Sequence, residues 1–322
     1  MQKGENIISA ALAAVVVLTV LAIQRKWQPA SLKEVASSAE EFILTTTGIG
    51  GQVPEIAGYE KVKTFRFGRY LAGLYRASPA PLVFAPGRFV IYNRDSQPVL
   101  KLETLEGSKE PWTTVYDFAG RRGLPLPGRR ARPEYTRNLL GDEDVEVVIG
   151  QYSGGDHCCT TATVVALGKE SVKMVGRIGG LDGLPFEGLE FRKLDADPAQ
   201  EIVAHRPYRT ICGSAGDAAD VLAVYDYVNG QYVDQTAHHA AFLEGVLRQD
   251  LARWEREKAR TLQLLQTLAT DYARMGQRDL GKRFFATHLM VFLPKLQNAG
   301  VDPNACIEDL DNLLDRLSGG VP

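Results

Sequence analysis

The chain has 322 residues, of which 45% are hydrophobic and 24% charged, as is ordinary for a globular protein. Its formal net charge of −2 excludes the strongly basic balance that is typical of nucleic-acid-binding proteins. The length allows one large domain or two medium ones with real hydrophobic cores. We therefore expect a folded protein that does not bind nucleic acid.

The first predicted element is the segment Ile7–Ile23, which is almost wholly apolar and carries no charge. A helix rises about 1.5 Å per residue, so this segment nearly spans a hydrocarbon core of about 30 Å. The small-residue pattern Val20-Leu21-Ala22 leaves a cleaved signal peptide open as the alternative. Because the apolar run is longer than a usual signal-peptide core, residues 1–27 are predicted to be an uncleaved transmembrane signal-anchor.

The orientation of this anchor is predicted from conflicting signals. Arg25, Lys26 and Lys33 follow the apolar segment, while Lys3 and the α-amine precede it. The positive-inside rule taken alone would place the C-terminal side in the cytoplasm. The cysteines and the family resemblance described below favour the opposite orientation. We expect the globular part to lie outside the cytoplasm, in the periplasm or at the cell exterior.

Residues 28–50 follow as a linker helix, because apolar residues recur at helical spacing between Leu32 and Ile43. From residue 51 to residue 236, short runs rich in Tyr, Phe and Val are separated by Gly and Pro, which is typical of β-strands. This region is predicted to be one β-rich domain. Within it, the arginine-rich segment Arg121–Arg132 is predicted to be a solvated loop, with a contact to nucleic acid or acidic lipid as the alternative.

An acidic turn followed by an apolar strand occurs twice in this domain. The first copy begins at Leu140 and leads into Val147-Val148-Ile149. The second begins 55 residues later, at Asp195, and leads into Ile202-Val203-Ala204. A hairpin is predicted after the second copy, because Asn229-Gly230 lies between two β-rich arms. The 55-residue period suits one antiparallel β-unit of a propeller or a related array.

These features together resemble a known family. The acidic turn, the apolar strand, the Gly-rich turn Ser153-Gly154-Gly155 and the Asn-Gly-x-Tyr-Val hairpin are similar to FG-GAP/VCBS-type repeats of secreted bacterial proteins. The resemblance covers about residues 135–236. It implies a β-propeller-like fold in the bacterial envelope, and it says almost nothing about activity.

Repeats of this family often bind Ca²⁺ through Asp-x-Asp-x-Asp-Gly turns, and Ca²⁺ takes six to eight oxygen ligands. Here Leu140 and Ala199 lack an oxygen at a ligand position, and Glu143 and Pro198 replace the glycine. We favour acidic turns that hydrogen-bond their own backbone, with weak Ca²⁺ sites as the alternative. The candidate metal ligands are Asp142, Asp144, Glu146, Asp195, Asp197 and Glu201.

The four cysteines are Cys158, Cys159, Cys212 and Cys306. Cys212 follows its acidic turn at nearly the distance by which Cys158 and Cys159 follow theirs. If the two units are neighbouring sheets, Cys212 should form a disulfide with one member of that pair, which would fit an oxidising compartment. Cys306 is expected to stay unpaired or to bond with the remaining member.

The sequence His157-Cys158-Cys159 leaves two chemical alternatives open. A zinc site is disfavoured because the spacing is not Cys-x₂-Cys and only His238 and His239 offer further nitrogen ligands. A nucleophilic Cys–His pair is disfavoured because neighbouring residues on a strand point to opposite faces. We therefore assign no catalytic residue here.

Residues 237–322 are predicted to be α-helical, because leucines recur at three- and four-residue steps. The part from residue 262 to residue 294 resembles a single tetratricopeptide hairpin. An ordinary helical hairpin is the favoured alternative, since solenoids need about three repeats. The positions that carry the resemblance are Leu265, Leu268, Ala269, Tyr272, Gly281 and Phe285.

The sequence thus predicts a mainly β protein with an N-terminal transmembrane helix and a C-terminal helical region. The favoured function is a membrane-anchored envelope module that binds or scaffolds a protein partner. One alternative is a hydrolase or metal-dependent enzyme that uses the region of His157, Cys158 and Cys159 or the acidic turns. The other is a structural accessory of an envelope assembly. No cofactor is expected beyond Ca²⁺ at the acidic turns.

Overall fold

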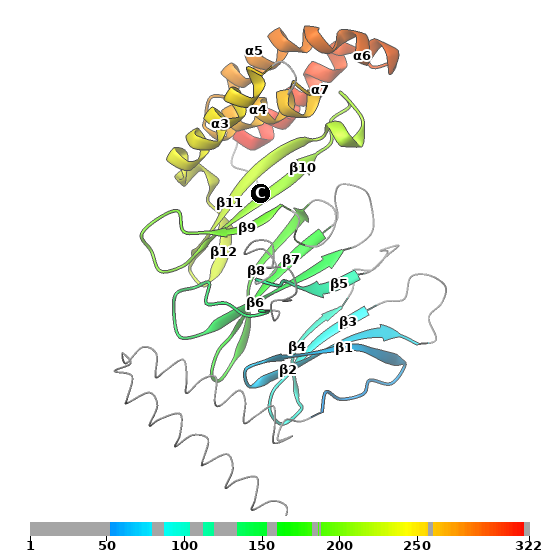
Figure 1. Ribbon diagram of the computed structural model, residues 1–322, viewed down its shortest axis with the longest axis vertical. Coiled ribbons are helices and arrows are strands. Elements are labelled where there is room, and N and C mark those ends of the chain that lie inside the picture. The colour runs from blue at the N-terminus through cyan, green and yellow to red at the C-terminus, as the bar shows by residue number, and fades with distance from the viewer. Residues whose placement is uncertain are drawn as a thin grey trace, which may run out of the picture.

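A computed structural model describes residues 52–78, 87–103, 112–118, 134–152, 160–181, 186, 188–256 and 260–318. Three antiparallel sheets lie in a row, and a group of helices covers one end of that row (Figure 1). The mainly β architecture with a helical C-terminal part is therefore confirmed. No helix in these ranges is long and apolar enough to cross a membrane, and the predicted anchor lies outside them.

Each sheet has four strands that pair in chain order, so each is a meander. The first sheet contains β1 (Tyr59–Phe67), β2 (Tyr70–Ala77), β3 (Gly87–Tyr92) and β4 (Pro98–Glu103). The second contains β5 (Trp112–Val115), β6 (Val145–Tyr152), β7 (Thr160–Leu167) and β8 (Val172–Leu181). The third contains β9 (Leu189–Arg192), β10 (Glu201–Tyr208), β11 (Ala219–Val228) and β12 (Gln231–Asp234).

The predicted Asn-Gly hairpin is confirmed between β11 and β12, where Val228 pairs with Gln231. Asn229 and Gly230 have φ angles of 52° and 88°, which is the left-handed region that a two-residue hairpin turn of this kind requires. The local sequence therefore determines this connection and its register.

The second sheet is buried on both of its faces. On β6, Val147 and Ile149 belong to the core shared with the first sheet, whereas Val148 belongs to the core shared with the third. All three side chains are fully buried. Side chains on a strand alternate between faces, so a continuous apolar run such as this one indicates a sheet that is covered on both sides.

The two acidic turns occupy equivalent places, because each precedes the second strand of its sheet. They also lie against each other: the Gln200 amide nitrogen donates to the Leu139 carbonyl oxygen at 2.7 Å. A Cβ atom at Gly141 would lie 2.3 Å from the carbonyl oxygen of Pro198, so this contact requires glycine. Within the described residues the sheets form a row and do not close into a propeller (Figure 1).

The helical part covers the free face of the third sheet. Leu243 of the first helix packs on Val203, Leu222 and Val224 of the strands. The α-helices are α3 (Ala240–Trp254), α4 (Leu262–Arg274), α5 (Arg278–Leu289), α6 (Leu293–Asn298) and α7 (Pro303–Ser318). The 3₁₀ turns are η1 (Ala215–Asp217), η2 (Thr236–His238) and η4 (Met290–Phe292).

Helices α4 and α5 form the hairpin that the sequence predicts, and α7 packs against both. A Cβ atom at Gly281 would lie 2.6 Å from the carbonyl oxygen of Ala269, so the two helices approach closely only because residue 281 is glycine. Leu265, Leu268 and Phe285 are buried in the same core. The relation of this hairpin to tetratricopeptide repeats stays a prediction.

The cysteine pairing differs from the one predicted. Cys212, in the β10–β11 connection, is bonded to Cys306 of α7, with their Cα atoms 4.7 Å apart. The expected bond from Cys212 to Cys158 or Cys159 is therefore wrong, as is the expectation for Cys306. The physical reason is that the β10–β11 connection enters the helical core, where Cys212 is fully buried. Cys158 and Cys159 lie outside the described residues.

Replacing Cys212 and Cys306 together with alanine should lower the free energy of unfolding. A link between residues 94 apart in the chain restricts the unfolded state, and a loop of that size contributes roughly 4–5 kcal/mol. Urea unfolding followed by circular dichroism measures the loss. Reduced wild-type protein should resemble the double variant, and a variant as stable as the oxidised wild type would contradict the pairing.

Candidate functional site

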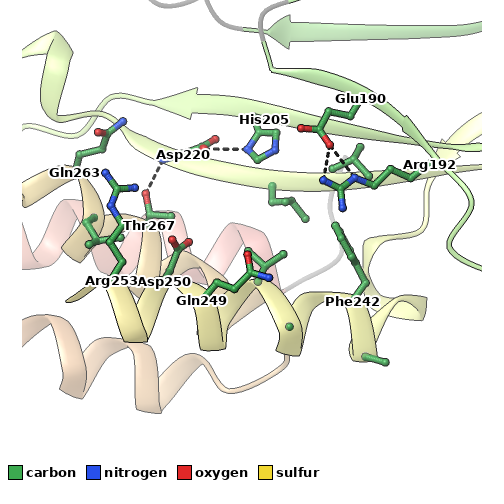
Figure 2. Close-up of a pocket in the computed structure, with 16 residues that line it drawn as sticks. Glu190, Arg192, His205, Asp220, Phe242, Gln249, Asp250, Arg253, Gln263 and Thr267 are labelled. Atoms are coloured by element: carbon green, nitrogen blue, oxygen red, sulfur yellow. Dashed lines mark hydrogen bonds and ion pairs between the residues drawn. The ribbon is translucent and has the colours of Figure 1, made fainter. Parts of the chain in front are cut away.

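A cleft of about 530 Å³ lies between the third sheet and the helices α3 and α4 (Figure 2). Its lining combines charged and amide side chains with apolar ones. The polar lining comprises Glu190, Arg192, His205, Asp220, Gln249, Asp250, Arg253, Gln263 and Thr267. The apolar lining includes Val203, Leu222, Phe242, Val246 and Leu264.

His205 and Asp220 form a hydrogen-bonded pair on the sheet wall, with His205 Nδ1 and Asp220 Oδ2 2.9 Å apart. The register places Leu222 opposite His205, so Asp220 lies two residues along β11 on the same face. The hydrogen bond to Asp220 raises the pKa of His205, and partial burial opposes this effect. The imidazole therefore stays protonated to a higher pH than a free histidine.

Hydrogen bonds connect α4, which lines one side of the cleft, to the third sheet. The amide nitrogen of Asp220 donates to Thr267 Oγ1 at 2.9 Å. At the preceding residue of α4, the Gln266 side chain donates to the carbonyl oxygen of Asp217 at 2.5 Å and accepts a hydrogen bond from Thr210. These buried contacts hold α4 at a fixed position relative to β11, so the width of the cleft is set by the fold.

A second charged pair lies at the β9 side of the cleft. Arg192 Nη2 lies 2.6 Å from Glu190 Oε2, because residues two apart on a strand share a face. The guanidinium of Arg192 also lies 5.5 Å from the centre of the Phe242 ring on α3. Both charges of this pair are thus partnered within the chain.

Asp250 rises from α3 toward the His205–Asp220 pair (Figure 2). Burial raises the pKa of Asp250, and the nearby charge of Asp220 raises it further, while Arg253 and His205 oppose the shift. The side chain of Asp250 forms no hydrogen bond and no ion pair with the residues that the structure describes. It is therefore a partly desolvated carboxyl group without a partner in this part of the chain.

Asp271 lies one turn beyond Thr267 on the same face of α4. Its side chain is buried, and its Oδ2 atom has no hydrogen-bond partner among the described residues. Burial raises the pKa of Asp271 well above its usual range, and Asp250 and Asp220 contribute in the same direction. Asp271 thus acts electrostatically on two carboxyl groups that line the cleft, although it does not line the cleft itself.

The arrangement suits binding better than covalent catalysis. The cleft lining contains neither serine nor cysteine. The hydroxyl oxygen of Thr267 accepts a hydrogen bond from the main chain and lies on the far side of Asp220 from His205 (Figure 2). A nucleophile within reach of a general base, as acyl transfer requires, is therefore not seen among the lining residues.

The acidic turns lie elsewhere, between the second and third sheets. Asp142 Oδ1 accepts from the Asp144 amide and Asp195 Oδ1 accepts from the Asp197 amide, both at 2.9 Å, as the self-bonded turns predict. Among the described residues, the structure brings Asp195, Asp197 and Glu201 together, with one carboxylate oxygen of each within 4.8 Å of the others. Calcium binding at this second turn stays a prediction.

Glu146 has a structural role in the first turn. Its Oε2 atom accepts from the Leu139 and Leu140 amides at 2.6 and 3.2 Å, and its side chain is fully buried. Burial raises the pKa of Glu146 to about 7, although the two amide hydrogen bonds oppose the shift. Glu201 bonds the Leu194 amide in the same way. Each of these glutamates therefore uses one carboxylate oxygen to accept hydrogen bonds from main-chain amides next to its own turn.

The histidine and cysteine candidates are not brought to the cleft. His157, Cys158 and Cys159 lie outside the described residues. His239, at the start of α3, is buried, and its Nε2 atom lies 2.6 Å from Oδ1 of the partly buried Asp226 on β11. His238 does not line the cleft. The described residues therefore bring neither histidine into a zinc-like group.

Sequence reasoning missed the cleft residues. His205 follows Val203 by two positions on β10, so it occupies a helix-facing position where an apolar residue would be expected. A polar residue at a position where an apolar one is expected was the one local feature that pointed to the cleft. It does not reveal the partner Asp220 or the opposing Asp250. In comparisons with known proteins, no family model, curated protein or solved structure matches the chain.

The buried carboxyl of Glu146 should make stability depend on pH. Its folded-state pKa of about 7 exceeds the ordinary value of 4.5, so the folded state favours the proton. The resulting stabilisation is complete below the ordinary pKa and is lost as the pH rises through the folded-state value. The full shift corresponds to roughly 3 kcal/mol.

The variant Glu146→Gln should lack the pH-dependent stabilisation that the protonated Glu146 carboxyl provides. Denaturant unfolding at pH values across this window measures the difference between variant and wild type. The exposed neighbour Glu143→Gln is the matched control and should keep the wild-type slope. Equal slopes in wild type and Glu146→Gln would show that the carboxyl is not the buried titrating group.

Proposed function

We propose that this chain is a membrane-anchored binding or scaffold module of the cell envelope, whose recognition site is the cleft between the third sheet and α3 and α4. The cleft is the observation that carries the proposal. Charged and amide side chains from the sheet and from the helices line it together with apolar ones, so a bound group would meet polar and apolar partners in one concave site.

The rigidity of the cleft walls supports a binding role. The Cys212–Cys306 bond ties α7 to the β10–β11 connection, and the Thr267–Asp220 hydrogen bond ties α4 to β11. A site that is already formed before binding avoids the entropy cost of ordering its walls. The helices therefore form one wall of the cleft at a fixed position relative to the sheet.

The location in the envelope is supported by two features. The uncharged segment Ile7–Ile23 is long enough to anchor the chain in a bilayer. A buried disulfide fits an oxidising compartment, which supports the proposal that the globular part lies outside the cytoplasm. A relation to FG-GAP/VCBS repeats is also part of this proposal, and it is supported by two successive four-stranded meanders that each carry an acidic turn before the second strand.

A metal-dependent enzyme is the second candidate. The observation that favours it is the group of Asp195, Asp197 and Glu201, whose carboxylates converge. This group lies apart from the cleft, and Glu201 already accepts a hydrogen bond from the Leu194 amide. We therefore rank it below the binding module.

Filling the cleft should weaken partner capture. Gly245 lines the cleft, and a Cβ atom there would meet no atom within 4 Å, so Gly245→Trp can be accommodated without a backbone clash. Proximity labelling of the full-length protein in native membranes should show partners of the wild type reduced about tenfold, equivalent to a loss of about 1.4 kcal/mol in binding.

The matched control is Ala252→Trp, which places the same side chain at an exposed position of α3 outside the cleft. This variant should retain the wild-type partners, and thermal unfolding should show that both variants are folded. Retention of all partners by Gly245→Trp would refute the cleft as the recognition site.

The anchor makes a separate prediction. Full-length protein should remain with the membrane after alkaline carbonate extraction, whereas a chain without residues 1–27 should be released. Protease added to intact spheroplasts should digest the globular part. Release of the full-length chain would contradict the anchor, and protection from protease would contradict the outward orientation.

A further inference from the structure

We propose that the cleft binds a primary ammonium group carried on an aliphatic stem, with Asp250 as its anionic partner. This inference rests on the proposed function, because it names the ligand class of the same cleft. It follows from the pairing of the charged groups on the cleft walls and from the apolar surface between them.

Two of the three carboxylates that line the cleft are already paired. Glu190 Oε2 lies 2.6 Å from Arg192 Nη2, and Asp220 Oδ2 lies 2.9 Å from His205 Nδ1. Asp250 is the remaining lining carboxylate, and it has no partner among the described residues. A ligand that supplies a cation therefore meets an acceptor that the described part of the chain does not satisfy.

The surroundings of Asp250 contain charges of both signs. Asp220 acts on it from β11, and the buried Asp271 of α4 is a third nearby carboxyl group. Arg253 also lines the cleft and lowers the pKa of Asp250, but it is exposed and forms no ion pair with a described residue. The positive charge of protonated His205 is opposed by Asp220, to which it is hydrogen-bonded. Asp250 is thus a lining carboxylate with no ion pair to a described residue, and an ammonium group can pair with it.

The apolar lining explains why the cation should carry a stem. Phe242 and Val246 of α3 are partly exposed, and they border the same cavity as Asp250. Val203, Leu222 and Leu264 border it too, but they are already buried. A bare inorganic cation would leave the exposed surface of Phe242 and Val246 in contact with water. An alkyl chain would cover that surface while its ammonium group reaches Asp250.

The same chemistry has two sources, a free alkyl diamine and a lysine side chain presented by another protein. A charge-assisted hydrogen bond to Asp250 would be shared by both. Only the lysine source would also place a peptide backbone at the mouth of the cleft. The two sources can therefore be separated by the probes used for binding.

Isothermal titration calorimetry of the full chain in detergent micelles tests this inference. The probes are 1,5-diaminopentane, N-acetyl-lysine methylamide and, as an anion of similar length, glutarate. We expect saturable binding of at least one amine and none of glutarate. Asp250→Asn should weaken amine binding by about tenfold, because the isosteric amide removes the charge.

The control variant is Glu244→Gln, which removes an exposed carboxylate of the same helix that pairs with Arg248 at 3.8 Å outside the cleft. It should bind the amines as the wild type does, and thermal unfolding should show both variants folded. Binding of the diamine alone identifies a free amine, and binding of the lysine derivative alone identifies a protein partner; binding of both supports the shared chemistry.

The inference is overturned if neither amine binds, if Asp250→Asn binds them as tightly as the wild type, or if glutarate binds more tightly. Its failure can be separated from that of the proposed function. Partner loss in Gly245→Trp without any amine binding refutes only the ligand class. Amine binding that depends on Asp250, with partners retained in Gly245→Trp, refutes only the cleft as the site of partner recognition.

Discussion

The burial of the second sheet on both faces is the constraint on which the other layers depend. Val147 and Ile149 need an apolar cover on one side, and Val148 needs one on the other. The first sheet supplies one cover and the third sheet supplies the other, so the row of three sheets follows from the composition of β6 and β7. The third sheet then has one apolar face left, and the helices cover it.

The helices cover the face of the third sheet incompletely, and the cleft lies where this cover is missing. Toward the middle of the third sheet, Val203, Leu222 and Val224 form a dry contact with Leu243 of α3. Toward one end, the same face carries His205 and its partner Asp220, which cannot be buried without hydrogen bonds. Helix α3 packs on the apolar part through Leu243, whereas α4 meets the polar part through the hydrogen bond from the Asp220 amide to Thr267. The candidate site is therefore a consequence of where charge interrupts the apolar face.

The acidic turns illustrate how a sequence motif can have a structural role that its usual family function does not indicate. Glu146 accepts hydrogen bonds from the Leu139 and Leu140 amides, and Glu201 accepts one from Leu194. Burying a carboxyl group is costly, and the raised pKa of Glu146 expresses that cost. In return, each turn is fastened to the start of its strand, which positions the contact between the second and third sheets.

The sequence by itself determined the features that depend on neighbours in the chain. The β-rich and helical regions, the Asn229-Gly230 hairpin and the self-bonded turns at Asp142 and Asp195 could all be predicted, because their hydrogen bonds and periodicities span only a few residues. Tertiary structure alone decided the Cys212–Cys306 bond and the cleft. The cleft brings Glu190 of β9 together with Asp250 of α3 and Thr267 of α4. Spacing along the chain carries no information about such contacts, because they depend on which faces of the sheets and helices are buried against one another.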